Sequence, residues 1–103
     1  MYKDWRDALT ILPSHMRDGM ERYIQHGIEG GSFMNTILEN DFVHAYQRAD
    51  WINREAMNLY ADYLFHYAPM DCWGNRLKVQ KWIASGGLSG IMDTQRVQAD
   101  EEC

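Results

Sequence analysis

The chain has 103 residues, of which 46% are hydrophobic and 13% aromatic, and its formal net charge at pH 7 is −5. This length is close to the usual size of one domain, and the apolar content excludes a chain that is disordered throughout. The acidic balance makes direct nucleic-acid binding an unlikely function, since phosphate contacts require a concentrated basic surface.

The two cysteines, Cys72 and Cys103, are too few for the disulfide framework of a small secreted domain. No stretch of the sequence approaches the ~20 apolar residues that cross a membrane, and the N-terminus has no apolar signal segment. We therefore expect a cytoplasmic protein with reduced thiols and no contact with a membrane.

The first twelve residues mix charged and apolar side chains and predict an N-terminal arm (residues 1–12), either a short helical turn or an extended segment. A first helix is predicted to begin at Ser14, whose hydroxyl can cap the first turn. Gly27 suits the left-handed residue that follows such a helix. The apolar stripe of this helix has four-residue spacing: Met16, Met20, Ile24 and Ile28.

A second helix is predicted to follow a cap at Ser32 and to continue to Ala49. One face of it carries the apolar residues Met34, Leu38, Phe42, Ala45 and Ala49. The polar run at 39–41 indicates either an exposed face or a kink between two shorter helices.

Asp50 is predicted to cap a third helix, which Pro69 ends because the residue before a proline is pushed out of the helical conformation. Its apolar stripe comprises Ile52, Ala56, Leu59, Tyr60, Tyr63, Leu64 and Tyr67, and Trp51 and Phe65 lie on other faces. A helix that is apolar on more than one side is either the centre of a bundle or partly covered by a partner chain. A homo-oligomer is therefore one expectation.

Asn75 is predicted to cap a fourth, short helix that carries Leu77, Trp82 and Ile83 and ends at the glycine pair 86–87. The remaining residues, 87–103, predict an acidic and weakly ordered tail. Short connections between helices favour antiparallel neighbours. The predicted fold is all-α, a small bundle of three to four helices with short loops, formed by a helical domain at residues 13–86.

The sequence predicts neither a metal site nor a catalytic group. His15 and His26 are about 16 Å apart along a helix, too far to bind one metal ion together. Cys72 and His66 are separated by a helix end and a proline turn, so a small buried apolar role for the cysteine is favoured over a nucleophile with its base. No motif that binds a phosphate or a dinucleotide occurs, and no cofactor is expected.

One polar cluster lies around the break between the second and third helices and comprises Arg48, Asp50, Asn53 and Arg54. The favoured interpretation is a network that caps the third helix and fixes the chain reversal. The alternative is a binding site, to which Tyr60 and Trp73 would add aromatic surface.

Several motifs in fixed order carry a family resemblance: HMRDGM (15–20), YIQHGIEGGSF (23–33), LENDFVHAYQRAD (38–50), YAPMDCWG (67–74) and KVQKWI (78–83). Together they resemble a family of small accessory proteins of tailed bacteriophages and prophages. The family has no established activity, so the resemblance implies no catalytic residues. It implies a phage origin, a location in the cytoplasm of the bacterial host, and action on a host protein or against host defence.

Three functions are expected from these observations, in descending order. The first is a non-enzymatic phage accessory protein that binds and modulates a host (or phage) protein through aromatic and methionine residues outside the core. The second is an oligomeric small-ligand binder that sequesters a nucleotide signal at the helix N-termini beginning at Ser32 and Asp50. The third is a helix-turn-helix regulator, which the lack of a basic recognition helix makes the weakest.

Overall fold

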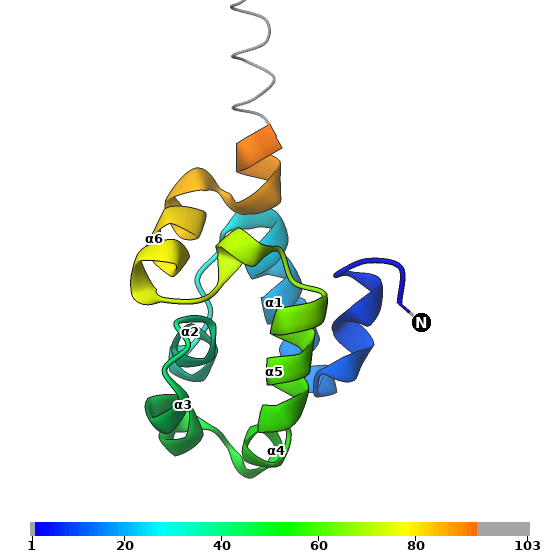
Figure 1. Ribbon diagram of the computed structural model, residues 1–103, viewed down its shortest axis with the longest axis vertical. Helices are drawn as coiled ribbons and strands as arrows, with labels where there is room; N and C mark the ends of the chain where they lie inside the picture. The colour runs from blue at the N-terminus through cyan, green and yellow to red at the C-terminus, as the bar shows by residue number, and fades with distance from the viewer. Residues whose placement is uncertain (1, 93–103) are drawn as a thin grey trace, which may run out of the picture.

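All the regular elements in the computed structural model, which describes residues 2–92, are helices (Figure 1). The prediction of an all-α chain is therefore confirmed for this range. Residues 87–92 of the predicted tail are helical, and the rest of that tail, including Cys103, lies outside the described residues. No helix in the described range is long and apolar enough to span a membrane.

The helices are shorter and more numerous than the predicted three or four. In chain order they are η1 (Asp7–Ile11), α1 (Ser14–His26), α2 (Ser32–Leu38), α3 (Phe42–Arg48), α4 (Trp51–Glu55), α5 (Met57–His66), η2 (Met70–Cys72) and α6 (Arg76–Ser85), where η denotes a 3-10 helix. Figure 1 shows α2 and α3 on one side of the molecule and α5 on the other, with α4 joining them at one end. The helix α1 lies behind α5, and α6 lies at the opposite end from α4.

The predicted second helix is divided at its polar run, as the kink alternative required. Asn40 adopts a φ of 62°, in the left-handed region that asparagine tolerates better than most residues. The N–H of Asp41 then donates to the carbonyl of Thr36 at 2.9 Å, which ends α2 before α3 begins. The expectation that Phe42 lies on a buried stripe is wrong, because the kink turns it outward and leaves it 64% exposed.

Two of the four predicted helix caps are confirmed. The side chain of Asp50 accepts from the N–H of Asn53 at 2.7 Å, and that of Asn75 accepts from the N–H of Lys78 at 2.9 Å. The caps predicted at Ser14 and Ser32 are wrong. Both serines are already the first residues of their helices, so the cap positions belong to the proline and glycine that precede them.

The predicted third helix is also interrupted, at Ala56, and only its second part forms a long apolar stripe. In α4, Ile52 is exposed and Asn53 is buried, the reverse of what a continuous stripe required. Leu77 of α6 and Ile28 after α1 are likewise exposed rather than buried.

The hydrophobic core includes part of the N-terminal arm. The buried side chains of η1 and the residue after it are Ala8, Leu9 and Leu12, and they join those of α1 and α5 in one cluster. The hydroxyl of Tyr63 in α5 donates to the carbonyl of Trp5 at 2.8 Å. The N-terminal arm is therefore a short helical turn that packs on α1 and α5.

The buried Tyr23 of α1 connects two C-terminal elements, η2 and α6, to the core. The hydroxyl of Tyr23 donates to the carbonyl of Cys72 at 2.6 Å, and the indole N–H of Trp82 donates to the carbonyl of Tyr23 at 3.0 Å. These two hydrogen bonds fix η2 and α6 against α1 and so position the loop that carries Trp73.

Candidate functional site

Two members of the polar cluster predicted from the sequence, the exposed Asp50 and the buried Asn53, help to fix the corner between α1, α4 and α5. Asp50 caps α4 and also contacts Nε2 of His15 in α1 at 3.0 Å. Asn53 is only 3% exposed, and its side-chain oxygen accepts from the hydroxyl of the fully buried Tyr60 at 2.7 Å. Buried polar groups with these partners contribute to the fold, and Tyr60 has no surface to offer a ligand.

The two arginines of the cluster lie at the surface. The guanidinium of Arg54 lies 4.6 Å from the ring centroid of Tyr46, a cation–π contact that joins α4 to α3. Arg48 is exposed at the end of α3. Of the four residues of the cluster, Asn53 is buried against Tyr60, whereas Arg48, Asp50 and Arg54 lie at the surface.

The carboxylate of Asp50 has a lowered pKa, chiefly because the N–H of Asn53 donates to it and also because His15 contacts it. A carboxylate also occupies the N-terminus of α4, which the nucleotide hypothesis had assigned to a phosphate. The geometry here does not favour that hypothesis.

We expect the Asp50→Asn variant to lose the part of its unfolding free energy that depends on the ionisation of Asp50. The helix cap should remain, since asparagine caps as well as aspartate. A carboxyl group with a lowered pKa in the folded state stabilises the protein above the unfolded-state pKa of ~3.9, and this contribution is lost as pH falls through the folded-state value. Thermal unfolding from pH 7 to pH 2.5 should show wild type more stable at pH 7 and the two proteins converging in acid. A constant difference across this range would contradict the role of the charge.

The thiol of Cys72 is not a candidate nucleophile. It is fully buried, and burial raises its pKa to about 12, with the charge of Asp71 adding to the effect. His66, which the sequence offered as its base, is exposed. Within residues 2–92 no group of three histidine, cysteine or acidic residues could hold a metal ion.

Alkylation should confirm that Cys72 is inert. In a Cys103→Ser background at pH 8, we expect iodoacetamide to modify native Cys72 at least roughly 1000-fold more slowly than the unfolded chain, because the thiolate is the reacting species. Mass spectrometry of timed samples with and without guanidinium gives both rates. Similar rates in the two conditions would show that the thiol is accessible and reactive.

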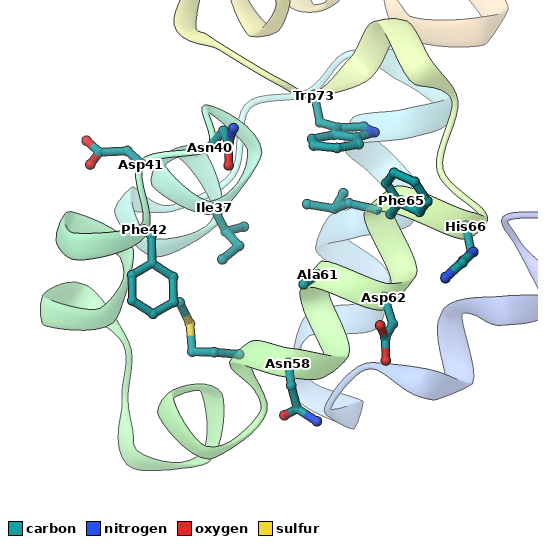
Figure 2. A pocket seen from close by; sticks show the side chains of 12 residues that line it. Ile37, Asn40, Asp41, Phe42, Asn58, Ala61, Asp62, Phe65, His66 and Trp73 are labelled. Atoms are coloured by element: carbon teal, nitrogen blue, oxygen red, sulfur yellow. The ribbon is translucent and has the colours of Figure 1, made fainter.

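A cleft of about 660 Å³ opens between the α2–α3 hairpin and α5. Figure 2 shows its lining, which comes from three separate parts of the chain. These residues are Ile37, Asn40, Asp41, Phe42, Met57, Asn58, Ala61, Asp62, Leu64, Phe65, His66 and Trp73. A cleft of this volume falls in the range of binding pockets in proteins.

The floor of the cleft is apolar and its walls expose large aromatic rings. Met57 and Leu64 are buried beneath it, whereas Phe65 is 74% exposed and Phe42 is 64% exposed. The half-buried Trp73 closes one end, and its indole N–H has no hydrogen-bond partner among the described residues. The cleft therefore presents apolar surface to solvent that the fold itself does not cover.

Of the six residues predicted for a binding site, only Trp73 lines this cleft. The apolar surplus on the third predicted helix was a signal for it, since Phe65 lies on the side of α5 that the core leaves uncovered. The exposure of Phe42 had no comparable signal, because it depends on the kink at Asn40.

Comparison of the chain with protein-family models, with curated proteins and with solved structures found no match. The function is therefore argued from the cleft, and the phage origin stays a prediction of the sequence.

Proposed function

We propose that this protein is a non-enzymatic binding protein, encoded by a phage or prophage, that modulates a host or phage protein by docking it on the cleft between α3 and α5. The observation that supports this most directly is the pair of phenylalanines, Phe42 and Phe65, exposed on opposite walls of an apolar cleft. Exposed aromatic residues around a pocket are typical of the centre of a protein interface.

Further exposed apolar side chains lie on α3 and α4. Val43 and Tyr46 follow Phe42 on α3, and Trp51 of α4 is 72% exposed. The rings of Phe42 and Tyr46 stack with their centroids 6.5 Å apart. A partner seated in the cleft would be able to cover part of this group as well, which would enlarge the buried interface.

Site-specific cross-linking tests the proposal. The photoreactive residue p-benzoylphenylalanine, placed at Phe65 in one variant and at the exposed Gln80 of α6 in another, compares the cleft with a distant surface. In bacterial lysate, with and without phage infection, we expect one dominant cross-linked protein at position 65 that is absent at position 80. A Phe42→Ser substitution should reduce its yield about tenfold or more, because aromatic anchors of an interface contribute at least ~1.4 kcal/mol.

No dominant product at position 65, or the same products at both positions, would contradict binding at the cleft. A product that consists of two copies of this chain would instead identify a homo-oligomer.

Loss of binding must be separated from loss of folding. We expect Phe42→Ser and Phe65→Ser each to change the free energy of unfolding by no more than about 0.5 kcal/mol, because both side chains are mostly exposed. Urea unfolding followed by circular dichroism measures this. A loss above about 2 kcal/mol in either variant would show that the ring belongs to the core.

A further inference from the structure

We infer that the cleft accepts an α-helical segment of the partner, with an apolar face flanked by lysine or arginine. This inference rests on the proposed function and specifies the chemistry of the partner. Three properties of the cleft support it: the nature of its walls, its length along α5, and the charge at its rim.

The walls of the cleft are helices, which favours a helical occupant. Because α2, α3 and α5 are helices, these walls offer no strand edge to an extended segment. An extended segment would lose hydration of its own backbone without gaining hydrogen bonds in return. A helix satisfies its backbone internally and buries only side chains.

The length of the cleft matches about two and a half turns of such a helix. Along α5 the lining residues run from Met57 to His66, and the nine helical steps between them span roughly 13.5 Å at ~1.5 Å per residue. Side chains at positions i, i+4 and i+7 of an occupant helix span a similar distance. Met57 in the floor is flexible enough to adapt to different apolar anchors.

The rim of the cleft is acidic. Asp41 lies where α3 begins, with its carboxylate pointing away from the apolar lining, and Asp62 lies on the α5 side (Figure 2). The carboxylate of Asp41 contacts Nδ1 of His44 at 2.8 Å, and no lysine or arginine is among the described residues that line the cleft. A helix with basic residues beside its apolar face is complementary to this arrangement.

A different protein is favoured over a second copy of this chain as the occupant. The formal net charge of −5 makes two copies repel each other, whereas a basic segment is attracted to the same charge.

Selection from a library of random 16-residue peptides displayed on a surface tests the inference without knowledge of the partner. The bait is the full chain, and the Phe42→Ser/Phe65→Ser double variant removes peptides that bind elsewhere. We expect the survivors to carry apolar residues at i, i+4 and i+7, with lysine or arginine beside them and without internal proline. The best of them, synthesised with a fluorophore, should bind about tenfold more weakly to an Asp41→Asn/Asp62→Asn variant in fluorescence anisotropy at low salt.

Survivors that are acidic, that tolerate proline at the centre, or that bind the Asp41→Asn/Asp62→Asn variant equally well would overturn the inference, and so would the absence of any survivor. None of these results would affect a protein cross-linked specifically at position 65, which supports the proposed function by itself. Wild-type chain that sediments as a dimer, and as a monomer after Phe65→Ser, would show that a second copy occupies the cleft and would overturn the inference.

Discussion

Replacing Gly87 with alanine is expected to lower the free energy of unfolding by about 2–5 kcal/mol. Gly87 has a φ of 67°, which costs an L-residue with a side chain roughly 1–2 kcal/mol. A Cβ atom there would lie 2.5 Å from the amide nitrogen of Gly27 and 2.7 Å from the carbonyl oxygen of Ile24. Both are backbone atoms that cannot rotate away, so the clash adds a further cost of about 1–3 kcal/mol.

The contact is reciprocal, which gives a second variant with the same expected result. Gly27, the residue after α1, has a φ of 68°, and a Cβ on it would lie 2.7 Å from the amide nitrogen of Gly87 and 2.9 Å from the carbonyl oxygen of Trp82. The ends of α1 and α6 therefore meet backbone to backbone. Any side chain at either position would separate them and weaken the attachment of α6 to the core.

Gly31 is the matched control. It has an ordinary φ of −74°, and nothing lies within 4 Å of a Cβ built on it, so Gly31→Ala should change stability by no more than about 1 kcal/mol. Guanidinium unfolding of the three alanine variants gives the comparison. A typical domain is stable by only about 5–15 kcal/mol, so the Gly87 and Gly27 variants should unfold at a clearly lower guanidinium concentration. Equal stability of all three would show that the two helix ends are not in contact.

Two of the four predicted helix caps were correct, and Ser14 and Ser32 failed because each lies one residue inside its helix. Asp50 and Asn75 were predicted correctly as caps because a cap depends on the residue itself and on the N–H three positions later. Gly27 was predicted correctly as left-handed for the same local reason. The burial of Phe42 was predicted wrongly, because it assumed one continuous helix through Asn40. Whether a side chain faces the core or the solvent depends on the backbone angles of the residues before it.

The candidate site was harder still to predict, because its residues are far apart in the sequence. Arg48, Asp50, Asn53 and Arg54 were grouped because they are close in sequence, and two of them, Asp50 and Asn53, proved to fix a corner of the fold. The cleft combines residues 37–42, 57–66 and 73, which only the tertiary structure brings together. Composition indicated that apolar surface would be left over, and Trp73 is the one predicted site residue that lines the cleft. No periodicity within one segment could show that Phe42 and Phe65 would lie on opposite walls.

Replacing Tyr23 with phenylalanine is expected to cost about 1–3 kcal/mol, the usual effect of leaving a buried acceptor without its donor. The hydroxyl of Tyr23 donates at 2.6 Å to the carbonyl of Cys72, and both residues are fully buried. Water cannot replace the donor without opening the core. Tyr2→Phe is the control, because Tyr2 is exposed and its ring contact with Tyr67 does not involve the hydroxyl. Urea unfolding that shows equal stability for both variants would contradict a structural role for the hydrogen bond.

The same substitution should also alter stability at alkaline pH. Burial raises the pKa of Tyr23, and of Tyr60 and Tyr63, above the ordinary value. A group whose pKa is raised on folding stabilises the protein fully below its unfolded-state pKa of ~10 and loses this contribution as pH rises through the folded-state value. Wild type should therefore lose stability above about pH 10 as protons leave the three phenols of the unfolded chain. The unfolding free energy of Tyr23→Phe should fall less steeply with pH, because one fewer phenol releases its proton on unfolding. If the unfolding free energy of the variant and of wild type changed equally with pH between pH 9 and pH 11, water would reach this hydroxyl. The attachment of η2 to α1 would then need another explanation.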